Sequence, residues 1–142
     1  MSSRFSLRFM VLLALLSSLG VVGCNQPADY AIVGSADVPS VHGDVEVEKI
    51  DKQQVLVTVV LDQLPAASQI EPEFSEYAVW FVVVGEDPRF QGTLDYDDEG
   101  RTGRGSFPTE LREFELRVTA ERSATPATPN FILVASQEIR EK

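Results

Sequence analysis

Few side chains in this sequence have types that could do chemistry: one thiol, one imidazole and a run of carboxylates. The thiol belongs to Cys24 and the imidazole to His42. A transition-metal site needs more nitrogen or sulfur ligands than one histidine supplies, and no nucleophile-elbow sequence supports a Ser-His-Asp arrangement. Because His42 lies between Pro39 and Gly43, we expect it in a loop and not in a reactive centre.

The carboxylates gather in segment 95–100, which has acids at relative positions 1, 3 and 5 and glycine at position 6, as in part of an EF-hand loop. Calcium would need a further bidentate carboxylate at position 12, where this chain has Ser106, and Arg101 and Arg104 add positive charge. The segment is therefore predicted to be a solvated hairpin turn. We expect no metal, no cofactor and no enzymatic activity, although paired carboxylates leave a hydrolase as a third alternative.

The first residues have the pattern of an export signal. Arg4 and Arg8 precede an uncharged apolar run, 9–22. At about 1.5 Å per residue this run spans roughly 21 Å as a helix, which is short of a hydrocarbon core of ~30 Å. A helical signal peptide is therefore favoured over a permanent transmembrane helix.

The end of this leader, Val21-Val22-Gly23-Cys24, resembles the bacterial lipobox at all four positions. The resemblance implies cleavage between Gly23 and Cys24 and lipidation of the Cys24 thiol, with two acyl chains on sulfur and usually a third on the new amino terminus. Two or more chains give stable anchoring. Residues 1–23 are thus predicted to be a lipoprotein signal peptide, and 24–29 a lipidated tether. Because Asn25 follows the cysteine, the outer membrane facing the periplasm is favoured for a Gram-negative source.

The charge of the chain limits its partners. Loss of Arg4 and Arg8 with the leader changes the formal net charge from −10 to −12. A nucleic acid partner is excluded because its phosphates require neutralisation by Lys and Arg, and so acidic a surface also opposes lying flat on anionic lipid headgroups. With the single thiol lipidated, no disulfide can form within the chain, so hydrophobic burial must stabilise the mature fold without covalent cross-links.

Residues 30–142 form one domain of short strands separated by turn signals, without a long helical pattern. This predicts an all-β fold, an antiparallel immunoglobulin-like β-sandwich of seven or eight strands. The expected strands are 30–33, 44–50, 53–64, 77–85, 89–96, 102–107, 111–120 and 131–135.

The most apolar strand, 77–85, has apolar residues on both faces, which indicates a central strand covered on each side. One face should meet the core, and the other is covered either by Ile70 and Phe74 of the preceding loop or by another protein. Tyr77, Trp80 and Phe81 are therefore a possible interaction surface, with burial in the core as the alternative.

Two stretches, 77–82 with 91–94 and 114–121, resemble the extracytoplasmic C-terminal domain of anti-sigma-K factors. The shared positions are mostly strand-core residues, so the resemblance implies a fold more than an activity. The helical sigma-binding segment and membrane span of that family are not expected here. The resemblance implies a lipid-tethered extracytoplasmic sandwich that senses or binds in the envelope.

Together these observations predict a membrane-anchored bacterial lipoprotein whose non-catalytic domain binds another envelope protein. A small-ligand or carbohydrate-binding module is the alternative. An exposed apolar sheet face would favour the protein partner, and an aromatic-lined cleft with convergent polar groups would favour the ligand.

Overall fold

The computed structural model describes residues 26–130 and 132–141. The predicted signal peptide, its cleavage site at Gly23 and the lipidation site at Cys24 lie outside the described residues and stay predictions.

The described chain is built almost entirely from strands, which confirms the all-β class. The strands are β1 (Ala28–Gly34), β2 (His42–Lys49), β3 (Val55–Asp62), β4 (Glu76–Val82), β5 (Arg89–Thr93), β6 (Asp95–Asp97), β7 (Thr102–Thr109), β8 (Glu113–Glu121) and β9 (Leu133–Arg140). The one helical element in these residues is the short α1 (Ala67–Ile70), inside the predicted 66–75 loop.

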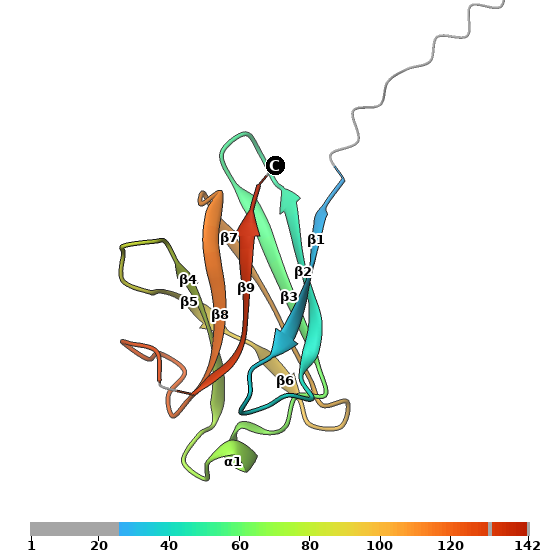
Figure 1. Cartoon of the computed structure of the whole chain (residues 1–142), viewed down its shortest axis with the longest axis vertical. Coiled ribbons are helices and arrows are strands. Elements are labelled where there is room, and N and C mark those ends of the chain that lie inside the picture. The colour runs from blue at the N-terminus through green and yellow to red at the C-terminus, as the bar shows by residue number, and fades with distance from the viewer. Residues whose placement is uncertain (1–25, 131, 142) are drawn as a thin grey trace, which may run out of the picture.

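All strand pairs are antiparallel, and the order across the sheet is β5-β4-β8-β9-β1-β2-β3-β7-β6. The sheet folds over so that β5-β4-β8-β9 packs against β1-β2-β3-β7-β6, giving the predicted sandwich-like arrangement (Figure 1). The two layers are continuous through β1 and β9, so the fold approaches a barrel.

The expected single strand 89–96 is in fact two strands, which raises the number in the described residues to nine. β5 pairs with β4 at one end of the sheet order, whereas β6 pairs with β7 at the other end. The connecting residue, Leu94, is buried, and its backbone N–H donates to the Tyr77 carbonyl over 2.8 Å. The chain therefore passes from one layer to the other at Leu94 and nearly closes the barrel.

The join between β1 and β9 is short. Only Val33 with Ser136 and Gly34 with Ala135 are paired in register. The Ser35 N–H strengthens this end by donating to the Val134 carbonyl over 2.8 Å. Towards the other end the two strands diverge, and a side chain bridges them: the Tyr30 hydroxyl donates to the Arg140 carbonyl over 2.6 Å. The sandwich is therefore sealed at one end and open at the other.

The space between the layers is filled by alternating apolar side chains of both layers. Phe81 of β4 lies at its centre, with its ring centroid 6.4 Å from that of Phe107 on β7 and 4.3 Å from that of Phe114 on β8. Ile70 and Phe74 pack into this core. The prediction that they cover the outer face of the 77–85 strand is therefore wrong, because they pack with Tyr77, Val79 and Phe81 of its inner face.

The outer face of β4 is nevertheless covered within the chain. Trp80 is 0% exposed, and the centroid of the Phe90 ring on β5 lies 5.3 Å away. The Trp80 indole N–H donates to the Thr119 hydroxyl over 2.8 Å, and this hydroxyl donates to the Glu121 carboxylate over 2.7 Å. The Asn130 backbone N–H also donates to that carboxylate, which fastens the end of the Thr- and Pro-rich loop, residues 123–129, to the sheet.

We predict that Thr119→Val destabilises the domain by about 2–4 kcal/mol, because it leaves the buried indole N–H without an acceptor and removes a donor from the buried carboxylate. The matched control is Thr58→Val, whose hydroxyl contacts Ser106 on an exposed part of the sheet and whose loss should cost less than about 0.5 kcal/mol. Denaturant unfolding monitored by tryptophan fluorescence measures both. Equal effects at the two sites would contradict the buried network.

Candidate functional site

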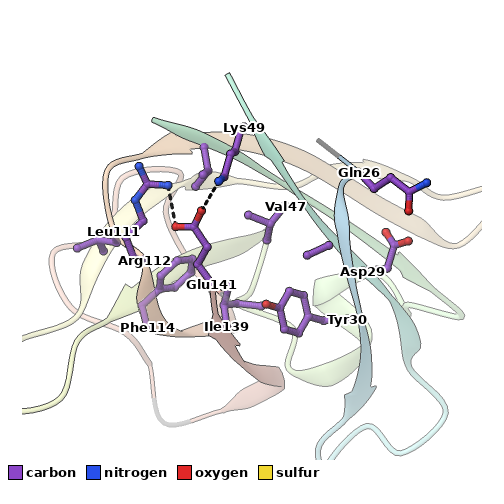
Figure 2. Close-up of a pocket in the computed structure, with 12 residues that line it drawn as sticks. Gln26, Asp29, Tyr30, Val47, Lys49, Leu111, Arg112, Phe114, Ile139 and Glu141 are labelled. Atoms are coloured by element: carbon purple, nitrogen blue, oxygen red, sulfur yellow. Dashed lines mark hydrogen bonds and ion pairs between the residues drawn. The ribbon is translucent and has the colours of Figure 1, made fainter. Parts of the chain in front are cut away.

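The open end of the sandwich contains a cavity of about 520 Å³, in the size range of small-molecule sites. It lies where β1 and β9 diverge, and the β2–β3 hairpin and the segment before β8 complete its wall (Figure 2). The lining residues come from five places in the chain: Gln26, Ala28, Asp29, Tyr30, Val47, Lys49, Val55, Leu111, Arg112, Phe114, Ile139 and Glu141.

The inner part of the cavity is apolar. Its buried residues, Val55, Phe114 and Ile139, belong to the central core. Tyr30 and Leu111 are only partly buried and pack against the same core. The cavity is thus the uncapped end of the hydrophobic core, and an apolar ligand entering it would continue the packing between the layers.

The mouth of the cavity carries a three-residue ion-pair network (Figure 2). The Glu141 carboxylate lies 3.1 Å from the Lys49 ammonium nitrogen and 2.8 Å from a guanidinium nitrogen of Arg112. The Arg112 guanidinium also donates to the Lys52 carbonyl, and the Glu141 N–H donates to the Arg112 carbonyl over 2.9 Å. This network holds the C-terminal segment against the hairpin.

The two cations stabilise the charged form of Glu141. The hydrogen bond from Lys49, with the charge of Arg112 as a further contribution, lowers the pKa of Glu141 below its ordinary value of 4.5. The pKa of Asp51 at the hairpin tip is also lowered, because its carboxylate accepts hydrogen bonds from the Gln53 and Gln54 backbone N–H groups. The Asp51 carboxylate is thus hydrogen-bonded within its own turn, whereas the Glu141 carboxylate forms the ion pairs with Lys49 and Arg112.

The predicted interaction residues lie elsewhere and are buried. Tyr77 is 2% exposed, and Trp80 and Phe81 are 0% exposed. The Tyr77 hydroxyl donates to the Pro65 carbonyl, and burial raises the pKa of this phenol. These three side chains therefore present no surface to a partner, and the interaction-surface prediction is wrong. The alternative prediction, that these residues are buried, is confirmed: Tyr77 and Phe81 belong to the core, and Trp80 is covered on the other face of the strand.

His42 and the acidic segment each make contacts with their own stretch of backbone. His42 is the first residue of β2 and not a loop residue, and its exposed ring contacts the backbone carbonyl of Ser40 at 3.1 Å. In the acidic segment, Asp97 accepts a hydrogen bond from the Glu99 N–H within the β6–β7 turn. Among residues 26–130 and 132–141, no cluster of three or more His, Cys, Asp or Glu side chains could hold a metal ion. Within the same ranges, no helix is long and apolar enough to span a bilayer.

Sequence reasoning missed the cavity, although one signal for it is present. In the alternating segment 44–50, Lys49 has the same parity as the inward residues Val45 and Val47. A lysine in the inward register at the end of a strand indicates that the core ends there and that its mouth is charged. No comparable signal marks Arg112 or Glu141, whose meeting depends on the fold.

No family model, curated protein or solved structure matches this chain. The lipobox and the resemblance to anti-sigma-K factors stay predictions from the sequence.

We predict that the Glu141 carboxyl titrates below pH 4.5, so its ion pairs persist at neutral pH and are lost as the pH falls through the lowered pKa. Lys49→Gln should move the titration midpoint upward, whereas Lys52→Gln, on the same hairpin, should leave it in place. Carbon-detected NMR of the side-chain carboxyl measures each midpoint. A midpoint at or above 4.5 in the unmodified protein would contradict the network.

Proposed function

We propose that this chain is a lipid-anchored protein of the bacterial envelope whose β-sandwich binds a small ligand at its open end and performs no catalysis. The observation that carries the proposal is the cavity of about 520 Å³, with its apolar floor and its charged mouth. A pocket that combines apolar side chains with a few convergent polar groups is typical of ligand sites.

The small-ligand alternative thereby takes precedence over a protein-interaction or envelope-sensing module. A protein partner was expected on an exposed apolar face of the 77–85 strand, but that face is covered by the chain's own side chains. The large exposed apolar residues of the described chain are Val33, Ile50 and Val84. They come from three separate segments, and singly scattered apolar residues need no partner.

The proposed anchor gives the cavity a position in the envelope. Cys24 precedes Ala28 by four residues, which reach roughly 14 Å at most when extended. Gln26 and Ala28 both line the cavity. If Cys24 carries acyl chains, the cavity mouth lies within a short distance of the bilayer. In a Gram-negative source, Asn25 after the cysteine favours the periplasmic face of the outer membrane.

A hydrolase remains the third alternative. It would need an acid, a base or a nucleophile directed at one bound substrate. The mouth carboxylate, Glu141, is engaged by Lys49 and Arg112, and His42 lies among none of the cavity-lining residues. The chemistry of this end of the described domain is that of charge complementarity and apolar contact.

We predict that Cys24→Ala leaves the unprocessed precursor in the membrane, because the thiol that takes the lipid is gone. Intact-mass measurement of the membrane fraction distinguishes precursor from mature acylated protein. His42→Ala is a control that should be processed normally. Unchanged cleavage and acylation of the Cys24→Ala protein would remove the lipoprotein proposal.

We predict that Val47→Trp abolishes ligand retention, because the indole fills the cavity from the inward face of β2. The same substitution at Val33, which is 67% exposed on β1, is the matched control and should retain ligand. Native mass spectrometry of protein purified from producing cells detects a bound species. If both variants keep the same bound mass, the ligand does not occupy this cavity.

A further inference from the structure

We infer that the occupant of this cavity is a single-chain amphiphile with a carboxylate head, that is, a fatty acid. The inference rests on the proposed function and names the ligand class for that same site. Its head would meet Lys49 and Arg112 at the mouth, and its tail would enter the apolar inner part.

The first support is a carboxylate that already occupies the head position. Glu141 places its two oxygens between the Lys49 ammonium and the Arg112 guanidinium, at 3.1 and 2.8 Å. These two cations therefore have the spacing that a carboxylate requires, and the guanidinium offers it charge-assisted hydrogen bonds. Glu141 lies just beyond the end of β9, where a side chain can leave without breaking a strand pair.

The second support is the apolar path behind the head position. Ile139 on β9 and Phe114 on β8 are register partners and both line the cavity. Tyr30 of β1 lies across the gap, and its ring extends from β1 toward β9 (Figure 2). A linear alkyl tail can lie along these three side chains, between strands that diverge from a joined end.

The third support is the local charge. In a chain of net charge −10, the hollow that adjoins the mouth is lined by Lys49, Lys52 and Arg112 against Asp51 and Glu141. Asp29 also lines the cavity, from the β1 side. An anionic head is thus attracted to the β2–β8 side of the mouth and repelled from the β1 side, which orients the ligand.

The Glu141 carboxylate consequently competes with the ligand for the same two cations. Removing its charge frees them without changing the shape of the side chain. Glu141→Gln should therefore bind a fatty acid about two- to fivefold more tightly, while Lys49→Gln should bind it about three- to fivefold more weakly, as expected for a partly exposed ion pair. A purely structural role of the network would give a loss in both variants.

The test uses the domain that begins at Asn25, because all strand pairs and the core come from residues 28–140, and a cooperative unfolding transition checks its folding. Dodecanoate, 1-dodecanol and dodecyltrimethylammonium are titrated by calorimetry below their aggregation concentrations at neutral pH. Lys52→Gln is the matched control for Lys49→Gln. NMR shift changes locate the site through the backbone amides of Tyr30, Leu111 and Ile139.

Support requires that dodecanoate bind more tightly than the other two amphiphiles, with shifts at the cavity residues, a gain in Glu141→Gln and a loss in Lys49→Gln but not in Lys52→Gln. Equal binding of all three amphiphiles overturns the carboxylate assignment while keeping a ligand in the cavity. Failure of all three overturns the inference. In that case the proposed function stands only if native mass spectrometry detects a ligand bound to protein from producing cells and Val47→Trp loses it. If no bound ligand is detected, the proposed function is overturned together with the inference.

Discussion

The two-residue join between β1 and β9 is the constraint on which the rest of this structure depends. Because only Val33 and Gly34 pair with β9, the two layers are held together at one end and free to separate at the other. A longer ladder between these strands would close the barrel and bring the layers into contact along their whole length. The cavity thus lies where β1 and β9 separate and no longer hydrogen-bond to each other. Tyr30, whose hydroxyl reaches the Arg140 carbonyl, limits how far the strands separate.

The opposite margin of the sheet is closed by different means. There the chain itself passes from β5 to β6 at Leu94, so the two ends of the strand order are covalently continuous. Phe107 packs over this crossing, and two glycines make room for it: a Cβ at Gly105 would lie 2.6 Å from the Phe107 ring, and one at Gly92 would lie 2.9 Å from it. Close approach explains glycine at position 105, and at position 92 it adds to a backbone φ of +156° that other residues rarely adopt. Because the layers are covalently continuous at this crossing, the β1–β9 side is the place where the sandwich opens.

The fold class follows from local patterns, and the site does not. The structure contains the strands predicted from alternation in 44–50 and 53–64 and from the apolar run at 77–85. Successive side chains of a strand point to opposite faces, so a strand with one buried face has an alternating sequence. The division of 89–96 between β5 and β6 was missed, since a chain that changes layers keeps its strand-like composition. The sequence also leaves open whether Trp80, which faces away from the core, is buried. Its partners Phe90 and Thr119 are 10 and 39 residues distant along the chain. Sequence alone cannot pair such residues.

The charged mouth is a site that the sequence does not reveal, because its residues are far apart along the chain. Lys49, Arg112 and Glu141 are each ordinary in their own segments, a strand end, a loop and a chain end, and only the sheet order brings them together. Ion pairs this exposed contribute little to stability, so the network is better explained by what it does at the entrance than by what it adds to folding. Two cations around a displaceable carboxylate, set above an uncapped apolar core, form a mouth that keeps a net positive charge when empty and can exchange one carboxylate for another. That exchange leaves the paired strands untouched, because Glu141 lies just beyond β9.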